Sequence, residues 1–504
     1  MTLINLRNIG VTLAEPLFSN INLTISKGDR VGLVAANGRG KSTLLKAIAG
    51  ETETTHGEIT ASRGVCIGLV SQDVPETLLD VPIYDAVLDA LDADQAENES
   101  WRVDITLNDL QVPSDIWGQP LGTLSGGWQR IALLARVWVR EPDVLLMDEP
   151  TNHLDLNRIG ILQQWLETVA RSTPFLLASH DRAFLDAVTN KTFFLRTELS
   201  HTFALPYSQA RQALDEIDLA AARQNEKELA KAGQLRRQAA KLKNIGINSG
   251  SDLLLTKTRQ LKDRADKIEE TSRPAHNERS AGKIRLTNSG THAKSLVTID
   301  EAEISTPGGK SLFRVGPLWI NRGDRIVVLG ANGTGKTLFM TRVISALEEE
   351  SSDIRIAPSA VPGVSDQALS QLDAFKSPMD AVTSNSDVGD RNARALLAGA
   401  GTNIGVQDSP ISTLSGGQRS RLAMLMLRLA QPNFYILDEP TNHLDIEGQE
   451  ALEQELLAHD ATTLLVSHDR AFVRNVGTRF WQIERRRLLE VDSPEAFFSQ
   501  QLKH

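Results

Sequence analysis

Short apolar runs recur along the chain, and they predict buried parallel strands. The clearest are residues 144–147 (VLLM) and 434–437 (FYIL), each followed at once by Asp and Glu. Continuous apolar runs of this length are typical of parallel strands that are covered on both faces. Each run should therefore bring two acids to the carboxyl end of a strand. The acids are Asp148 with Glu149, and Asp438 with Glu439.

The same arrangement of motifs occurs twice, about 290 residues apart. LSGG and DEPTNHLD recur with equal spacing, starting from Leu124 in one case and from Leu414 in the other. A repeat of this length indicates two tandem copies of one domain. We expect the copies at residues 1–205 and 281–504, with a linker at residues 206–280.

Each copy also contains a glycine-rich loop between a predicted strand and a predicted helix. Strand, glycine loop, lysine, hydroxyl and helix together form the sequence context of a phosphate-binding P-loop. Backbone N–H groups would surround the phosphates, the lysine would reach the β and γ phosphates, and the hydroxyl would bind Mg²⁺. The loop residues are Ala35, Ala36, Asn37, Gly38, Arg39, Gly40, Lys41, Ser42 and Thr43 in the first copy, and Gly330, Ala331, Asn332, Gly333, Thr334, Gly335, Lys336 and Thr337 in the second.

Ala35 stands where the motif has its first glycine, which is Gly330 in the second copy. An alanine fits there only if its φ angle is negative. One interpretation is a harmless variation, because Gly38 and Gly40 remain. The other is that the first loop binds nucleotide less well, which the nucleotide affinities of variants lacking one loop lysine would decide.

A Ser-Gly-Gly segment precedes a predicted helix in each copy. Such a segment exposes the N-terminus of a helix, whose unpaired N–H groups and dipole attract phosphate. Each copy is therefore predicted to offer an anion-binding helix end as well as two acids. The residues are Ser125, Gly126 and Gly127 in the first copy, and Ser415, Gly416 and Gly417 in the second.

The region between the copies predicts a long antiparallel pair of helices. Residues 208–244 lack proline and would form a helix about 55 Å long. Residues 246–252 are predicted to break it, and a second helix should run from about residue 253 to residue 271. The apolar positions spaced for one face of the first helix are Leu214, Ile217, Leu229, Leu235 and Leu242.

Charge distinguishes this pair of helices from the rest of the chain. From Lys231 to Lys267 there are ten Lys and Arg residues against three Asp and Glu residues, whereas the whole chain has a net charge of −10. The acidic total argues against a uniformly basic nucleic-acid binder and leaves room for a local basic element. A basic hairpin of residues 208–274 suggests contact with an RNA backbone, and a solvated helical spacer is the alternative.

Nothing in the sequence predicts insertion into a membrane. No run approaches the roughly 18 apolar residues of a spanning helix. The start of the chain lacks the basic residues and apolar stretch of a signal peptide. We expect a cytoplasmic protein that would serve a membrane process only through a separate partner.

Taken together, the motifs resemble those of the ATP-binding cassette proteins, and within them the ABC-F group. The resemblance covers essentially the whole chain, and its most specific marks are the two PTNHLD runs and Trp128 directly after the first Ser-Gly-Gly. It implies an α/β fold with two tandem P-loop ATPase domains, each with a mixed sheet and a helical subdomain, joined by a long helical hairpin. It also implies a Mg²⁺-dependent ATPase with ATP and Mg²⁺ as cofactors.

The resemblance implies roles for individual residues. Asp148 and Asp438 would hold Mg²⁺, together with Ser42 and Thr337, and the glutamate after each aspartate would position or deprotonate the attacking water. The histidines of a repeated Ser-His-Asp-Arg would touch the γ-phosphate. The glutamates are Glu149 and Glu439, and the histidines are His180 and His468.

Gln72 resembles the family's Q-loop glutamine, which senses Mg²⁺ and water. In the second copy the best candidate for that role is Gln367, and Gln371 is the alternative.

Each nucleotide in such a protein lies between the P-loop of one copy and the Ser-Gly-Gly of the other. Lys41 would then work with Ser415, and Lys336 with Ser125. ATP would hold the copies together within a monomer, and hydrolysis would release them.

Two departures from the family pattern stand out. The arginine expected four residues beyond the second signature glycine is Arg421 in the second copy, but Ile131 occupies that position in the first. The aromatic residue that often stacks on adenine is not evident before either loop, so GTP stays open beside ATP.

The leading hypothesis is an ATPase that acts on the ribosome, docking its hairpin near tRNA or ribosomal RNA. The alternatives are the energy subunit of a transporter, a DNA-associated ATPase, and a protein that only switches shape on binding nucleotide.

Overall fold

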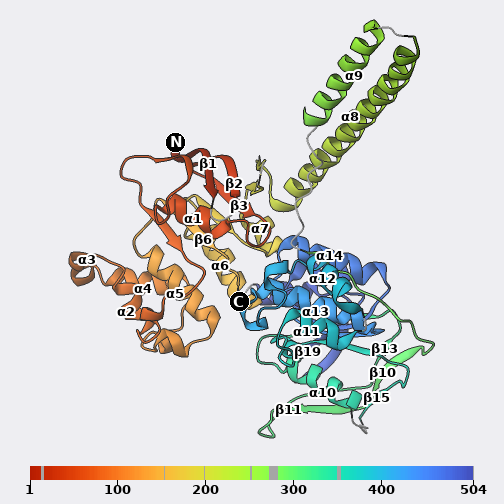
Figure 1. Cartoon of the computed structure of the whole chain (residues 1–504). Coiled ribbons are helices and arrows are strands. Elements are labelled where there is room, and N and C mark those ends of the chain that lie inside the picture. Colours follow the sequence, from red (N-terminus) through yellow and green to blue (C-terminus); the bar gives the residue numbers. More distant parts are fainter. Residues whose placement is uncertain are drawn as a thin grey trace. The chain divides into compact units, whose positions relative to one another are not determined.

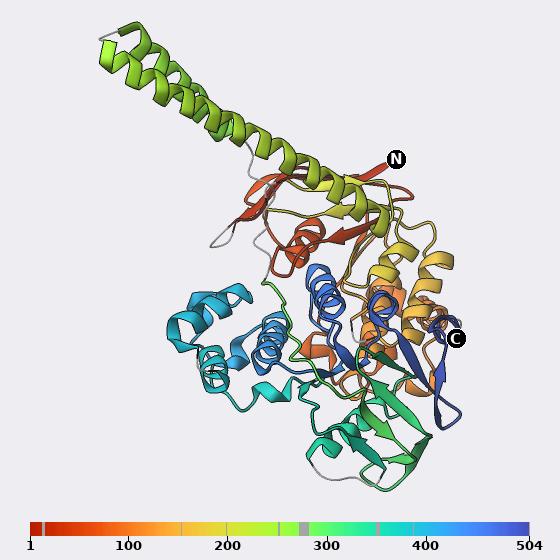
Figure 2. The ribbon, with the colours of Figure 1, turned by 90° about the vertical axis from the view of Figure 1, so that its right-hand side faces the viewer.

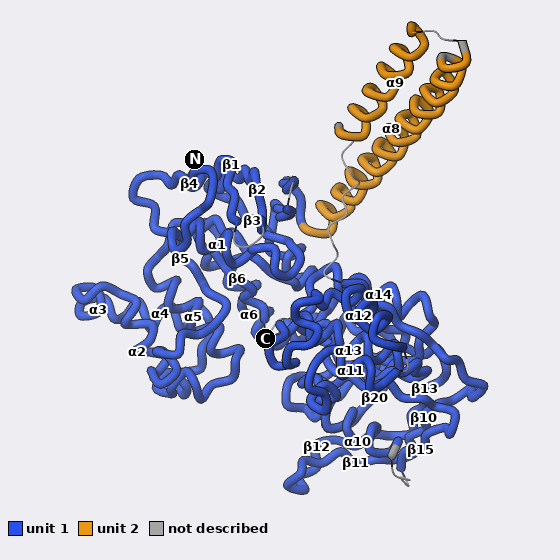
Figure 3. Tube along the Cα trace, viewed as in Figure 1, with its two compact units in different colours: residues 1–206, 280–504 blue, residues 207–279 orange. Residues whose placement is uncertain are grey.

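The computed structural model of the chain describes residues 1–12, 16–152, 154–197, 199–249, 252–271, 282–348, 353–386 and 388–502. The chain divides into two compact units (Figure 3). Unit 1 contains residues 1–206 and 280–504, and thus both copies of the repeat, and unit 2 contains residues 207–279. His153 of the repeated motif and residues 272–274 of the predicted hairpin lie outside the described residues.

A mostly parallel sheet carries the motifs of the first copy (Figure 1). Six described strands form it in the order β5-β6-β7-β3-β8-β9, and β9 is antiparallel to β8. Every residue of β6 is buried, as expected for a strand covered on both faces. An antiparallel sheet, β2-β1-β4, shares its hydrophobic core. The strands are β1 (Thr2–Thr12), β2 (Pro16–Ser26), β3 (Arg30–Val34), β4 (His56–Ala61), β5 (Ile67–Val70), β6 (Val144–Asp148), β7 (Phe175–Ala178), β8 (Lys191–Phe194) and β9 (His201–Phe203).

The second copy repeats this plan with a wider sheet. Its eight described strands run in the order β11-β12-β20-β19-β14-β18-β17-β16, and a separate sheet has the order β13-β10-β15. The centre is parallel, and β19 pairs with β20 antiparallel, so the expected α/β class with mixed sheets is confirmed. The strands are β10 (Ser295–Ile299), β11 (Ala302–Ser305), β12 (Ser311–Val315), β13 (Leu318–Asn321), β14 (Arg325–Leu329), β15 (Ile354–Ile356), β16 (Pro362–Ser365), β17 (Phe434–Asp438), β18 (Thr462–Val466), β19 (Arg479–Glu484) and β20 (Arg487–Val491).

Helices connect these strands in both copies, and one group in each copy forms a helical subdomain between the sheet strands β5 and β6, or β16 and β17. In the first copy the helices are α1 (Lys41–Ala49), α2 (Ile83–Leu88), α3 (Ala93–Asn98), α4 (Trp101–Asp109), α5 (Gly126–Trp138), α6 (Leu156–Thr168) and α7 (Arg182–Val188). In the second they are α10 (Lys336–Glu348), α11 (Pro378–Asn385), α12 (Gly389–Gly399), α13 (Gly416–Ala430), α14 (Ile446–Ala458), α15 (Arg470–Val476) and α16 (Glu495–Gln501).

A buried cluster of charges joins the two copies. Arg182, at the start of α7, pairs with Glu453 of α14 and lies 3.4 Å from Asp469. Arg470, at the start of α15, approaches Asp181 to 3.6 Å. Burial raises the pKa of Asp469 to about 6, although Arg182 acts against the rise. The copies therefore meet at paired charges that are out of reach of bulk water.

Unit 2 is a helical hairpin of α8 (Tyr207–Ser249) and α9 (Asp252–Thr271), which run side by side (Figure 2). The predicted start of the break at residue 246 is too early, since α8 continues to Ser249, whereas the second helix begins at Asp252, close to the expected residue 253. A single glycine costs a helix only about 1 kcal/mol relative to alanine, which a helix of this length absorbs.

The predicted apolar face of the hairpin is wrong in part. Ile217 and Leu229 are exposed, and the fully buried hairpin residues around the contact include Ala232, Ala239 and Ala265. Small side chains at these positions allow the two backbones to approach closely. Arg236 forms ion pairs of 2.7 Å with Asp266 and with Glu269 of α9.

Among the residues described, none of the helices combines the length and the apolar character needed to span a lipid bilayer.

Candidate functional site

Each glycine loop leads from a buried strand to a helix that starts at the loop lysine. β3 leads to α1 at Lys41, and β14 leads to α10 at Lys336. The residue before each lysine, Gly40 or Gly335, has a φ of 87° or 102°, a region that favours glycine. A Cβ at Gly40 would also lie 2.8 Å from the ring of Phe18. The loops therefore need glycine here for both conformation and space.

Ala35 fits the first loop for a reason that the structure makes visible. Its φ lies outside the positive range, so alanine is not strained there. In the second copy, a Cβ at Gly330 would lie only 2.8 Å from the hydroxyl of Thr334. Arg39 occupies the position of Thr334 in the first copy, which removes that clash.

The two acids of each copy stand at the carboxyl end of β6 or β17, and both members are buried. The glutamates follow directly, with left-handed φ angles of 50° at Glu149 and 53° at Glu439. The backbone N–H of each glutamate donates to the neighbouring strand, to Ala178 or Val466, at 2.9 Å. The strand ends thus hold both acids in equivalent positions.

Four predicted residues of the first copy meet in one network. Lys41 Nζ lies 2.6 Å from His180 Nε2 and 3.5 Å from Glu149 Oε1. The same His180 nitrogen lies 3.1 Å from Glu149 Oε1 and 3.1 Å from Asn37 Oδ1. The loop lysine, the glutamate and the histidine are thus within contact of one another.

Burial lowers the pKa of His180 to about 4, and Lys41 acts in the same direction while Glu149 acts against it. Between pH 6.5 and about 4 an unfolded chain binds a proton at this histidine and the folded chain does not. Lowering the pH through this window therefore favours unfolding. We expect the thermal midpoint of nucleotide-free protein to fall over this range, and less steeply in His180→Gln.

His468→Gln is the matched control, because the side chain of His468 is 26% exposed against 15% for His180. Equal pH dependence of the midpoint in wild type and His180→Gln would contradict a buried neutral histidine.

The second copy has the same residues in a looser arrangement. Lys336 Nζ donates to the carbonyls of Gly330 and Ala331 at 2.7 and 3.2 Å. His468 Nε2 lies 3.5 Å from Glu439 Oε1. Burial lowers the pKa of Lys336, and the charge of Glu439 acts against the change.

The first acid and the loop hydroxyl of each copy form an oxygen-rich pair that fits a magnesium ion. Thr337 Oγ1 donates to Asp438 at 2.8 Å. Burial raises the pKa of Asp148 and of Asp438, and hydrogen bonds from Ser42 and Thr337 respectively offset part of it. Within the described chain Asp148 Oδ1 is buried without a hydrogen-bond donor. Carboxylate and hydroxyl oxygens are the ligands that Mg²⁺ prefers.

Strand register relates the glutamines to the acids. In β5 and β16, Val70 and Ser365 lie opposite the residue that precedes the first acid of each pair. Gln72 and Gln367 each stand two residues further on, and both are exposed. Gln371 instead donates to Ser365 at 3.3 Å. The register therefore gives Gln367, rather than Gln371, the position that corresponds to Gln72.

The Ser-Gly-Gly segments begin α5 and α13, but their caps differ. Ser415 accepts from the N–H of Gln418, whose side chain accepts in return from the N–H of Ser415, which is a capping box. Ser125 makes no such side-chain bond, because Trp128 stands in the place of Gln418. Gly126 and Gly127 open α5, and Gly416 and Gly417 open α13.

The first loop contacts the second copy at its Ser-Gly-Gly helix and at the end of its repeated motif. Asn37 N–H donates to Asp445 Oδ2 at 2.9 Å, and Asn37 Nδ2 donates to the carbonyl of His443 at 3.1 Å. A Cβ at Gly417 would lie 3.2 Å from Asn37 Nδ2. In the other direction, Asp155 is close enough to Lys336 to act on its pKa.

Asp155 and Asp445 were missed as functional residues in the sequence. Each caps the N-terminus of the helix after the acid strand, accepting from a backbone N–H at 2.9 or 3.0 Å. The available signal was their place as the last residue of a motif that recurs unchanged in both copies.

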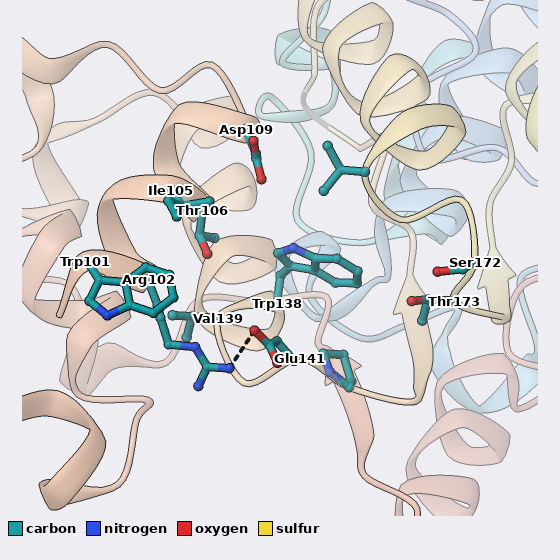
Figure 4. A pocket seen from close by; sticks show the side chains of 12 residues that line it. Trp101, Arg102, Ile105, Thr106, Asp109, Trp138, Val139, Glu141, Ser172 and Thr173 are labelled. Carbon is teal, nitrogen blue, oxygen red and sulfur yellow. Dashed lines mark ion pairs between the residues drawn. The ribbon is translucent and has the colours of Figure 1, made fainter. Parts of the chain in front are cut away.

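A separate pocket of about 380 Å³ opens between α4, the end of α5 and the segment before β7 (Figure 4). Trp101 and Trp138 line it, and Arg102 pairs with Glu141 there. None of its lining residues belongs to the predicted site.

Comparisons with known proteins agree with the two-copy plan. The family model described as "ABC transporter" matches residues 18–152 and 317–442, once in each copy. ATP-binding protein Uup of Haemophilus influenzae is 31% identical, over 96% of this chain and 79% of that protein. ABC transporter F family member 5 of Arabidopsis thaliana is 28% identical, over 94% of this chain and 73% of that protein.

A likeness of fold extends to a solved structure. In the complex of an archaeal ribosomal stalk protein with an archaeal ribosome recycling factor, the matched chain has a TM-score of 0.65 and 19% identity. The match covers 98% of this chain and 92% of that one.

Proposed function

This chain belongs to the ATP-binding cassette family, as a two-cassette member of its F group, and we propose that closure of its cassettes on ATP drives its helical hairpin to act on the ribosome. The cassettes bind ATP with Mg²⁺ and hydrolyse it to ADP and phosphate. In this proposal residues 1–205 and 281–504 are the cassettes, residues 206–280 are the linker, and the protein works as a cytoplasmic monomer.

The proposal gives each residue of the site a role. The N–H groups of residues 35–43 and 330–337 hold the phosphates, and Lys41 and Lys336 contact the β and γ groups. Asp148 and Asp438, with the hydroxyls of Ser42 and Thr337, would hold Mg²⁺, which would neutralise charge on the phosphate oxygens. The glutamate after each aspartate orients the attacking water and accepts its proton.

The remaining contacts to the γ-phosphate would come from both cassettes. The histidine of each cassette lies beside its glutamate and would face this phosphate. The Ser-Gly-Gly helix of the opposite cassette closes the site, so that Ser415 serves Lys41 and Ser125 serves Lys336.

The observation that carries the ribosomal proposal is the surface of the hairpin. All ten Lys and Arg residues from Lys231 to Lys267 are exposed. The described ion pairs of Arg236 engage one of these side chains with two acids of α9, and most of the positive charge faces solvent. A row of exposed cations on a stiff hairpin suits a ribonucleic-acid backbone, where binding releases counterions.

Co-sedimentation with ribosomes tests this function. The variant Glu149→Gln, Glu439→Gln should hold ATP without cleaving it, so we expect it to pellet with ribosomes in ATP far more than without nucleotide. Replacing Lys241, Lys243, Lys257 and Arg259 with Gln should weaken that binding and flatten its salt dependence. The absence of ATP-dependent enrichment would remove the ribosomal function.

Two further measurements distinguish the alternatives, the first on the variant Glu149→Gln, Glu439→Gln and the second on the wild type. Stronger binding to duplex DNA than to ribosomal RNA at matched salt would favour a DNA-associated ATPase. Stimulation of wild-type turnover by a membrane fraction would favour a transporter subunit.

A further inference from the structure

A buried arginine of the second cassette holds the aspartate that reaches the first P-loop. Arg421 Nη2 lies 2.8 Å from Asp445 Oδ1, and the two side chains are 6% and 1% exposed. While Arg421 binds Oδ1, the other carboxylate oxygen, Asp445 Oδ2, accepts a hydrogen bond from the N–H of Asn37 in the first cassette at 2.9 Å. Burial alone would raise the pKa of Asp445, but Arg421 and the N–H groups of Asn37 and Gly448 bring it below the ordinary value.

The first cassette lacks this arrangement. Ile131 occupies the position of Arg421, and the equivalent aspartate, Asp155, is paired within its own cassette. Arg158 Nη1 lies 3.0 Å from Asp155 Oδ2, and its guanidinium stacks 4.6 Å from the ring centroid of Trp128. Asp445 thus uses Oδ2 to bind the other cassette, whereas Oδ2 of Asp155 is paired with Arg158 of its own cassette. Over the described residues, no hydrogen bond joins Asp155 to Asn332, the counterpart of Asn37.

The anchor continues into the reacting groups of the first site. Asn37 Oδ1 lies 3.1 Å from His180 Nε2, and this nitrogen lies 3.1 Å from Glu149 Oε1. An unbroken run of contacts therefore leads from Arg421 through Asp445 and Asn37 to the glutamate that orients water. In the second site, His468 Nε2 lies 3.5 Å from Glu439 Oε1. Within the described residues, no arginine at the position of Arg421 supports this site, because Ile131 stands there.

We propose that Arg421 is a positioning residue that orders the nucleotide site of Lys41 and Glu149, and that Ile131 leaves the site of Lys336 and Glu439 without this anchor, so that the two sites turn over ATP unequally. This inference rests on the ATPase part of the proposed function. A buried charged pair fixes geometry at the moment of reaction without further reorganisation. The first site is therefore the one whose loop is held by an anchored contact from the opposite cassette.

Site-specific turnover tests the proposal. Arg421→Met keeps the length of the side chain and removes its charge, and it is introduced into two parents. Glu439→Gln reports turnover at the first site, and Glu149→Gln reports turnover at the second. The kcat of the Glu439→Gln parent divided by that of the Glu149→Gln parent gives the ratio of first-site to second-site turnover. We expect Arg421→Met, introduced into both parents, to lower this ratio about tenfold, the scale of one charge-assisted hydrogen bond.

Two further variants separate positioning from folding. Arg421→Lys should restore much of the ratio, because it returns a cation to Asp445. Arg428→Met, at the opposite end of the same helix, should leave the ratio at its parental value.

An equal fall in both parents, or no fall in the first-site parent, overturns the proposal. If Arg421→Met does not fold, Asp445→Asn in the same parents gives the same comparison, because it weakens the link to Asn37 while keeping the volume.

The outcome is independent of the ribosomal proposal. Turnover is measured without ribosomes, so failed co-sedimentation leaves the ratio interpretable. Conversely, if Arg421→Met leaves the ratio at its parental value, the positioning role of Arg421 is overturned, and the proposed function of the hairpin is not affected.

Discussion

Replacing both Glu149 and Glu439 with glutamine is expected to lower kcat for ATP hydrolysis by about 10²- to 10⁴-fold, the range typical of a lost general base. Each glutamate is buried at the end of its strand, and a backbone N–H of the adjacent histidine donates to its Oε2 at 3.1 Å. Glutamine preserves the shape of the side chain but cannot accept the proton of the attacking water. Phosphate release in single- and multiple-turnover experiments measures the change.

ATP affinity provides the control for this variant. It should change little, because the loop N–H groups and lysines that hold the phosphates are intact. Turnover within tenfold of wild type would show that neither glutamate acts as the base.

The second large effect is expected on stability, at the buried charges between the cassettes. Glu453→Leu removes one acid from the buried guanidinium of Arg182, which keeps its ion pair with Asp469. Breaking a buried pair from one side costs about 3–5 kcal/mol, so we expect a loss near 3 kcal/mol because one acid remains. The midpoint of thermal unfolding, measured by calorimetry, should fall accordingly.

Two comparisons make this prediction sharp. Adding Arg182→Met to Glu453→Leu should recover only part of the loss, because it removes the guanidinium that lost Glu453 but takes from Asp469 its arginine partner. Glu495→Leu removes the partner of Arg474 in an exposed pair of 2.7 Å, where about 0–1 kcal/mol is expected. If Glu453→Leu costs no more than Glu495→Leu, the junction is not held by charge.

The local parts of the fold could be predicted from the sequence because neighbours in the chain determine them. The strand, loop and helix around Lys41 and Lys336 follow from apolar runs and glycine spacing, and the acids fall where a parallel strand ends. The length of α8 could not be predicted in this way. Gly246 reads as a breaker, yet helical residues continue to Ser249.

The parts of the site that depend on packing were beyond the sequence. Ile131 is visible as a departure from the family pattern, but its consequence depends on which oxygen of Asp155 is occupied. Arg158 sits three residues away and has no motif of its own, and the ring of Trp128 fixes it. Likewise, the link between Asn37 and Asp445 joins residues from opposite cassettes, so it exists only once both are folded.

The left-handed backbone of Glu149 and Glu439 limits which residues are stable at these two positions. An L-residue other than glycine held at such a φ costs about 1–2 kcal/mol. Selection on thermostability alone would thus replace these glutamates by glycine or asparagine. A glutamate at so strained a position is therefore expected only where its carboxylate serves hydrolysis, and a related chain with glycine at one of the two positions should have one cassette that no longer hydrolyses ATP.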